Sequence, residues 1–277
     1  MSVLHVATAA EDYLPQAAAM LHSVLARRGE LEVQAHLLHG PRLRPRERER
    51  LRRVVEGGGA AIAFHAFTDA QVAGLPAPAR FTPAVWYSAF LPERLPHADR
   101  VLVLDADTIA ADDLSPLWET RLEGDLIAAV TNVFQPDHAF HAARLGVDAR
   151  AYFNSGVLLM DLAALRRTGA MEEVLAYARA HPDQLPWADQ DALNVVLGDA
   201  RRALHPRWNC MNALFAFPHA GEVLGAEAVR EARAGPGIRH FEGPGANKPW
   251  RLRSRVPHRE LYRTHARAAW PRRPFRA

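Results

Sequence analysis

Short apolar runs alternate with amphipathic stretches over the first part of the chain. Strands are predicted at 3–9, 31–38 and 61–67, where apolar residues form a continuous run or occupy every second position. Helices are predicted at 14–28, where apolar side chains recur every three or four residues, and at 44–56, a charged stretch that ends in glycines. This alternation predicts an α/β domain with a Rossmann-like, mostly parallel central sheet flanked by helices.

The same reading continues toward the middle of the chain. A helix is predicted at 82–95 and a buried strand at 101–104, and the remaining predicted elements are strands at 125–130 and 154–162 and helices at 171–180 and 189–198. Between the last two strands, residues 132–150 carry no regular pattern. That length is typical of a binding loop or lid, although an ordinary exposed loop fits equally well.

Composition limits the partners that the protein could have. The chain has 277 residues, 49% of them hydrophobic, and a formal charge of only +3, which is too small to indicate a nucleic-acid partner. The basic residues concentrate at the end, because residues 251–277 hold nine arginines and a single acid, Glu260. We therefore divide the chain into a domain, 1–250, and a basic tail, 251–277. Trp270 and Phe275 in that tail suit contact with an anionic membrane surface, but also a solvated terminus.

Location is constrained by cysteine use and by the absence of targeting signals. Cys210 is the only cysteine, so no disulfide can form within the chain, which favours a reducing compartment. The first residues lack the basic and apolar regions of a signal peptide, and no apolar run is long enough to span a membrane. We expect a cytoplasmic protein, with peripheral contact at the inner face of the membrane as a further expectation.

Two aspartates follow the buried strand 101–104 directly. Asp105 and Asp107 are two residues apart, and in extended backbone such side chains project to the same side. Two such charges about 4 Å apart repel by about 4 kcal/mol at an effective dielectric constant near 20, and a divalent cation relieves that repulsion. Carboxylates suit magnesium, manganese or calcium. The alternative is an Asx turn in which one aspartate caps the backbone.

A second functional interpretation of this stretch is nucleophilic. The sequence "DADT" after an apolar strand is locally similar to the motif of haloacid dehalogenase-type phosphatases, in which the first aspartate, here Asp105, attacks phosphorus. Those enzymes carry the motif on the first strand of their core. Here a long α/β pattern precedes it, which disfavours this alternative.

Three later stretches are informative together with "LDAD". They are "YFNSGVLLMDL", "WADQDALNVVL" and "IRHFEGPGANKPW", in that order along the chain. The combination resembles glycosyltransferase family 8, which includes glycogenin and bacterial lipopolysaccharide galactosyl- and glucosyltransferases. The resemblance covers residues 3–250. It implies a GT-A fold, a nucleotide-diphosphate-sugar donor, a divalent metal, usually manganese, and transfer with retention of the anomeric configuration.

The resemblance implies a metal site and a phosphate site. Asp105, Asp107 and His240 match the family's metal ligands, and a nitrogen ligand beside two carboxylates favours Mn²⁺, with Mg²⁺ as the alternative. Gly243 and Lys248 match the segment that contacts the donor diphosphate. Lys248 is the single lysine among 34 basic residues, and a compact ammonium can approach a phosphate where a planar guanidinium does not fit.

The resemblance also implies contacts to the sugar and to the nucleoside. Asn154, Ser155 and Asp189 match donor-sugar contacts, and Gln190 matches the residue that faces the anomeric carbon. The acids of this last stretch also suit the start of a helix. Donor-binding residues assigned at the nucleoside side are Asp12, Tyr13 and Ala106.

Two positions depart from the family pattern. Ala10 stands where an aspartate usually contacts the base, and Ser88 stands where an arginine usually helps to hold the donor. The sequence therefore leaves the nucleotide base open. The sugar, glucose or galactose, and the acceptor are open as well.

The expected activity is metal-dependent transfer of a hexose from a UDP-sugar to a glycan or lipid-linked saccharide. Because the Gln190 amide is a poor nucleophile, a front-face reaction is favoured, in which the acceptor enters on the side of the leaving group. The alternatives are a sugar-nucleotide-binding pseudoenzyme and a nucleotidyltransferase, which would release pyrophosphate.

Overall fold

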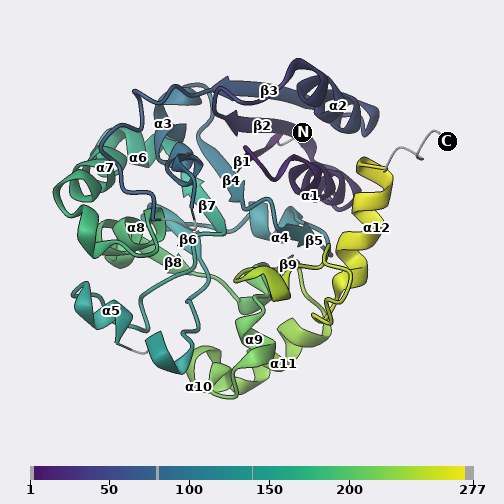
Figure 1. Ribbon diagram of the computed structural model, residues 1–277. Coiled ribbons are helices and arrows are strands. Elements are labelled where there is room, and N and C mark those ends of the chain that lie inside the picture. Colours follow the sequence, from purple (N-terminus) through teal and green to yellow (C-terminus); the bar gives the residue numbers. More distant parts are fainter. Residues whose placement is uncertain (1–2, 79–80, 139, 272–277) are drawn as a thin grey trace.

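Seven strands form the central sheet in the order β3-β2-β1-β4-β7-β6-β8 (Figure 1). The computed structural model describes residues 3–78, 81–138 and 140–271. The strands are β1 Val3–Ala9, β2 Glu32–His39, β3 Ala61–Ala66, β4 Arg100–Leu104, β6 Ile127–Ala129, β7 Val157–Asp161 and β8 Arg201–Ala203. Only β7 runs antiparallel to its neighbours among these seven strands of the described residues, so the predicted mostly parallel sheet is confirmed.

Helices cover both faces of this sheet. Their bounds are α1 Leu14–Ala26, α2 Pro45–Gly57, α3 Leu91–Arg94, α4 Ser115–Trp118, α5 His141–Arg144, α6 Leu162–Thr168, α7 Ala170–Ala180, α8 Asp189–Leu197, α9 Ala213–Ala216, α10 Ala220–Leu224, α11 Ala226–Ala234 and α12 Arg259–Ala269. Along β4, Leu102 and Leu104 pack into one buried cluster with α1, and Val101 and Val103 pack into another with α7 and α8. Burial on both faces explains why this strand is a continuous apolar run.

The predicted elements are confirmed except at a few boundaries. The helix expected at 82–95 is instead a 3₁₀ helix, η1 (Pro83–Phe90), followed by the short α3. Pro92 has no N–H to donate back along the chain, which prevents one continuous α-helix here. The strand expected at 154–162 is limited to β7. The sequence analysis did not predict the helices α4 to α6 and α9 to α12 or the short strand β8, and α5 lies within the stretch 132–150, which was expected to be irregular.

A second, two-stranded sheet lies beside the first. The strands β5 (Thr108–Ala110) and β9 (Ile238–His240) pair antiparallel, with Thr108 opposite His240. Neither strand was predicted, because three-residue strands carry too little pattern. Their pairing brings two segments 130 residues apart in the chain next to each other at the end of β4.

Part of the basic tail is folded against the domain. Helix α12 lies alongside α1 (Figure 1), and Tyr262 and Ala269 on α12 are buried. The guanidinium carbon of Arg50 lies 3.8 Å from the ring centroid of Trp270. Phe275 lies outside the described residues, and the boundary at residue 250 stays a prediction. Among the described residues, no helix combines the length and the apolar character needed to cross a membrane.

Candidate active site

The side chains of Asp105, Asp107 and His240 converge at the end of β4. The His240 Nε2 atom lies 3.6 Å from Asp105 Oδ2 and 3.2 Å from Asp107 Oδ1. One possible ligand atom from each residue lies within 4.8 Å of the others. Asp105 and Asp107 flank the turn between β4 and β5, and His240 is brought opposite them by the pairing of β9 with β5. The arrangement has the size and the donor types of a divalent-cation site.

Asn209 orients the His240 ring. Its Oδ1 atom lies 2.9 Å from His240 Nδ1. Because an amide oxygen only accepts, His240 Nδ1 carries the hydrogen, and Nε2 of the neutral ring offers its lone pair to a cation. The Asn209 amide is fixed in turn, since its Nδ2 donates to Asn154 Oδ1 at 2.8 Å. Sequence reasoning missed Asn209, because nothing in the stretch "PRWNCMN" distinguishes this asparagine for such a role.

Gly156 provides the space in which this site is built. A Cβ atom at this position would lie 2.3 Å from His240 Cε1 and 2.8 Å from Asp105 Oδ2. Real Cβ contacts are never so short, so any other residue would displace a proposed ligand. The backbone carbonyl of Gly156 also accepts a hydrogen bond from Asp105 N at 2.9 Å, which holds the start of the turn.

The charges of the cluster compensate one another. Burial opposes ionisation of Asp107, but the cationic His240 and Lys248 outweigh it and lower the pKa of Asp107. Burial tends to lower the pKa of His240, yet the carboxylates raise it. Loss of hydration and the charge of Asp107 raise the pKa of Asp105; since 56% of its side-chain surface is exposed, the charge is the stronger cause. The positive charges of His240 and Lys248 thus compensate the two neighbouring carboxylates.

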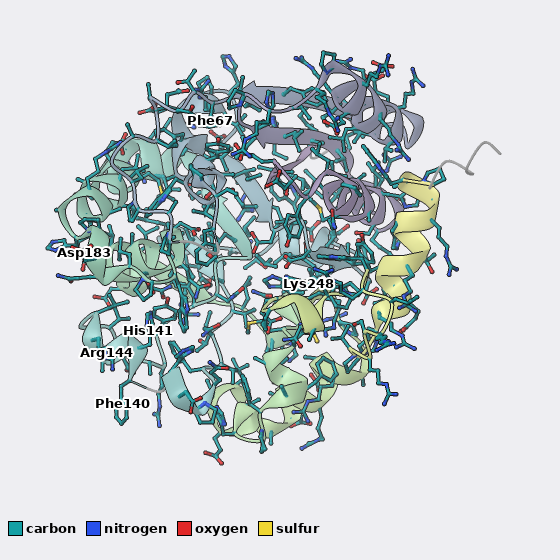
Figure 2. The ribbon with its side chains drawn as sticks, viewed as in Figure 1. Phe67, Phe140, His141, Arg144, Asp183 and Lys248 are labelled. Carbon is teal, nitrogen blue, oxygen red and sulfur yellow. The ribbon has the colours of Figure 1, made fainter. Side chains whose placement is uncertain are left out.

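Lys248 lies directly beside the cluster. Its ammonium pairs with Asp107 Oδ2 and donates to the carbonyl of Phe241 at 2.9 Å. The residue is 9% exposed and lies toward the middle of the molecule in Figure 2. Gly243, in the loop that leads to Lys248, has a φ of +89°, which favours glycine.

The predicted sugar contacts lie next to the same cluster. Gln190 Oε1 accepts hydrogen bonds from Asn154 Nδ2 and from Ser155 N, both at 3.1 Å. Burial and the charge of Asp105 raise the pKa of Asp189, the first residue of α8, so Asp189 lies within electrostatic reach of Asp105. Asn154 therefore connects the Gln190 side of the site, through Asn209, to His240.

The predicted nucleoside contacts follow β1 and β4 in the sequence. These two strands are neighbours in the sheet, at the point where the strand order reverses. Such a point in an α/β sheet is the usual place for a ligand. Tyr13 is 43% exposed at the start of α1, and its ring meets Trp250 edge-on with centroids 5.6 Å apart. Lys248 Nζ lies 5.6 Å from the centroid of Trp250, so this ring connects the two subsites. Asp12 is exposed, whereas Ala106 is buried.

One carboxylate of the region has a different environment. Asp191, which sequence reasoning did not assign, is fully buried. Its Oδ1 accepts from Tyr152 Oη at 2.5 Å and from His141 Nε2 at 2.6 Å, and its Oδ2 accepts from Trp187 N at 2.8 Å. Tyr152 and Asp191 both lie within the motifs that carry the family resemblance, which was the only signal for them.

Fold and site together define an enzyme with a GT-A fold. The sequence model of glycosyl transferase family 8 matches residues 5–253, and the chain belongs to this family. The protein is therefore a glycosyltransferase. This match leaves the phosphatase and nucleotidyltransferase alternatives without support.

Individual relatives agree with this assignment. The chain is 28% identical to General stress protein A of Bacillus subtilis, over 94% of this chain and 92% of that protein. It is 34% identical to Lipopolysaccharide 1,2-glucosyltransferase of Escherichia coli, over 36% of this chain and 30% of that protein. Several other curated relatives also match over less than half of their own length.

A solved structure matches over nearly the whole chain. The galactosyltransferase LgtC, in complex with donor and acceptor sugar analogues, superposes with a TM-score of 0.84 at 25% sequence identity, covering 96% of both chains. This similarity supports the GT-A fold independently of the sequence motifs.

Proposed function

We propose that the protein is a retaining hexosyltransferase that moves glucose or galactose from a UDP-sugar to a hydroxyl of a glycan or lipopolysaccharide-type acceptor. The observation that carries this proposal is the convergence of Asp105, Asp107 and His240 beside Lys248. The similarity to LgtC and to a lipopolysaccharide glucosyltransferase supports a hexose donor and a saccharide acceptor.

Asp105, Asp107 and His240 would hold Mn²⁺, or Mg²⁺ as the alternative. Their mixed oxygen and nitrogen donors suit manganese better than magnesium or calcium. A metal held there supplies positive charge that stabilises the diphosphate as it leaves. Lys248 adds the charge of its own ammonium. Since this ammonium pairs with Asp107, one of the proposed metal ligands, it lies beside the place where a metal-bound phosphate would sit and is close enough to contact a phosphate oxygen.

The remaining residues orient the sugar and the nucleoside. Asn154 and Asp189 hold sugar hydroxyls, and Gln190 faces the anomeric carbon. In the front-face reaction, the bond from C1 to the phosphate oxygen breaks, and a bond from C1 to the acceptor oxygen forms on the same side. The acceptor proton passes to the departing phosphate. Donor contacts at the nucleoside are assigned to Tyr13, Asp12 and Ala106, with Ser155 and Gly243 contributing at the sugar and the diphosphate.

The acceptor side is proposed to involve the segment 132–150. Phe140 is 75% exposed, at the rim of the molecule in Figure 2, and His138 is partly exposed. Aromatic faces such as these suit the apolar face of a sugar ring. If the segment closes over bound donor, UDP-sugar will slow its proteolysis; unchanged cleavage would contradict a lid.

The basic tail is proposed to contact an anionic membrane surface on the cytoplasmic side. Leu252 is 94% exposed between the exposed Arg251 and Arg253, which is a suitable composition for such contact. Because α12 packs on α1, a deletion would disturb the domain. Replacing Arg251, Leu252 and Arg253 with serine is a cleaner test. Equal binding of the wild-type protein and of this serine variant to anionic vesicles would contradict the proposal.

The decisive experiment measures UDP released from UDP-glucose and UDP-galactose, with and without Mn²⁺. Metal-dependent release is the expected result, and a thermal-shift panel of other sugar nucleotides tests the base. Stabilisation by a donor without any release would indicate the pseudoenzyme alternative. Lys248→Ala is expected to lower kcat more than it raises KM, and unchanged kinetics would remove Lys248 from phosphate binding.

A further inference from the structure

The two ends of the Gln190 amide have different partners. Its Oε1 accepts from Asn154 Nδ2 and Ser155 N, and its Nε2 donates to Tyr152 Oη at 3.3 Å. An amide rotated by half a turn would place N–H groups against these two donors. The neighbouring donors and acceptors therefore decide which way the Gln190 amide is turned.

Asp191 fixes the direction of the hydrogen bonds on the Nε2 side. An ionised carboxylate only accepts, so the Tyr152 hydroxyl must donate its single hydrogen to Asp191. The Tyr152 oxygen then has only lone pairs left for Gln190, which must offer Nε2–H. Burial and the charge of Asp191 raise the pKa of Tyr152, so the phenol keeps its hydrogen at neutral pH.

The surroundings leave the hydrogen-bonded series Asp191–Tyr152–Gln190 little freedom to rearrange. The Tyr152 and Asp191 side chains are fully buried. The second Asp191 oxygen is held by the backbone N–H of Trp187 at 2.8 Å, and His141 of α5 contacts the first at 2.6 Å. A buried carboxylate with three donors keeps its position, because releasing any of them would leave a polar group without a partner.

We propose that Tyr152 is a positioning residue that holds the Gln190 amide with Oε1 on the side of Asn154 and Ser155. The inference rests on the proposed function, in which Gln190 faces the anomeric carbon. Positive charge develops at that carbon as the diphosphate leaves. The partial negative charge of an amide oxygen stabilises it, whereas an inverted amide would present N–H groups and raise the barrier.

The first test compares Tyr152→Phe with Tyr177→Phe in UDP release. Tyr177 lies on α7 and packs its ring against His181, so it serves as a matched loss of one hydroxyl. Tyr152→Phe is expected to lower kcat about tenfold and to leave donor KM within about twofold, whereas Tyr177→Phe changes neither. Rates are normalised to the folded fraction from circular dichroism. An unchanged kcat for Tyr152→Phe would overturn the inference.

The second test asks whether Tyr152 acts through Gln190. In a Gln190→Ala background, Tyr152→Phe is expected to cause no further fall in kcat, because the amide that it orients is gone. A further tenfold fall would show an independent role and overturn the inference.

A third measurement is independent of turnover. The side-chain amide of Gln190 is identified in an ¹⁵N spectrum as the signal absent from Gln190→Ala. Tyr152→Phe is expected to shift this signal, and Tyr177→Phe is not; an unshifted signal in Tyr152→Phe overturns the inference. A wild-type protein that releases UDP from no donor would instead overturn the proposed function, while the spectrum still reports on the amide.

Discussion

The pattern Asp–x–Asp occurs twice in this chain, and the fold uses the two copies in opposite ways. Asp105 and Asp107 flank a turn at the end of a strand, and both approach His240 Nε2, at 3.6 and 3.2 Å. Asp189 and Asp191 lie in the first turn of helix α8, where residues two apart do not face each other. Asp189 lies close enough to Asp105 for the charge of Asp105 to raise its pKa, and Asp191 is fully buried.

The difference shows that spacing acquires meaning only through the backbone that carries it. The exposed fraction of the Asp105 side chain is 56%, and that of Asp191 is zero. Three donors already satisfy Asp191, whereas the neighbours of Asp107 are His240, a further proposed metal ligand, and the ammonium of Lys248. We therefore expect the first pair to determine metal binding, and the buried member of the second pair to determine stability.

The largest effect is expected for Asp105→Asn. A neutral amide is a much weaker ligand than a carboxylate, so Mn²⁺-dependent UDP release should fall more than about 100-fold. The thermal midpoint should stay within about 2 °C, because the side chain is exposed. Asp183→Asn, at an exposed position, is the control and should keep full activity. Full activity in Asp105→Asn would remove the metal assignment.

Asp191→Asn should lower stability rather than metal binding. The asparagine side chain offers an N–H₂ group where the carboxylate accepted, so one buried donor faces another. The free energy of unfolding should fall by about 2 kcal/mol, measured by urea denaturation against the same Asp183→Asn control. Mn²⁺ affinity, measured by calorimetry, should stay unchanged. A loss of affinity equal to that of Asp105→Asn would contradict the distinction between the two pairs.

Much of the fold was accessible from sequence because it rests on local patterns. The strands β1 and β4 are apolar runs, which indicate burial, and β2 was visible from its alternating apolar positions. The proposed metal ligands Asp105 and Asp107 were visible for a related reason, since charged residues directly after a buried strand are conspicuous. His240 and Gln190, by contrast, were assigned only through resemblance to the family.

The remainder depends on contacts between distant segments. Strand β9 exists because it pairs with β5, and nothing in three residues predicts that partner. Asn209 acts only because the fold places it 2.9 Å from His240, and Asp191 only because Tyr152 and Trp187 close around it. Spacing along the chain does not encode such partnerships, so single-sequence reasoning reaches the ligands before it reaches the residues that orient them.

A smaller effect is expected where the space around the first pair is filled. Gly156→Ala would place a methyl group 2.3 Å from His240 Cε1, so the ring must move. Mn²⁺ affinity should fall by about 30-fold in calorimetry, within the range seen when a ligand loses its orientation. Gly198→Ala is the matched control, because the added Cβ at that position meets nothing within 4 Å. Equal affinity of the two variants would show that His240 is not held by this packing.

The smallest effect should come from Asn209→Ala, which leaves all three proposed ligands in place. His240 Nδ1 loses its acceptor, so the ring can rotate and its Nε2 lone pair is less often directed at the carboxylates. Mn²⁺ affinity should weaken about tenfold. Comparing the loss of Mn²⁺ affinity in Asn209→Ala with that in Asp105→Asn thus separates the effect of a ligand's orientation from the effect of its charge. If Asn209→Ala weakened binding as much as Asp105→Asn, the Asn209 amide would be a participant in the site rather than a support for His240.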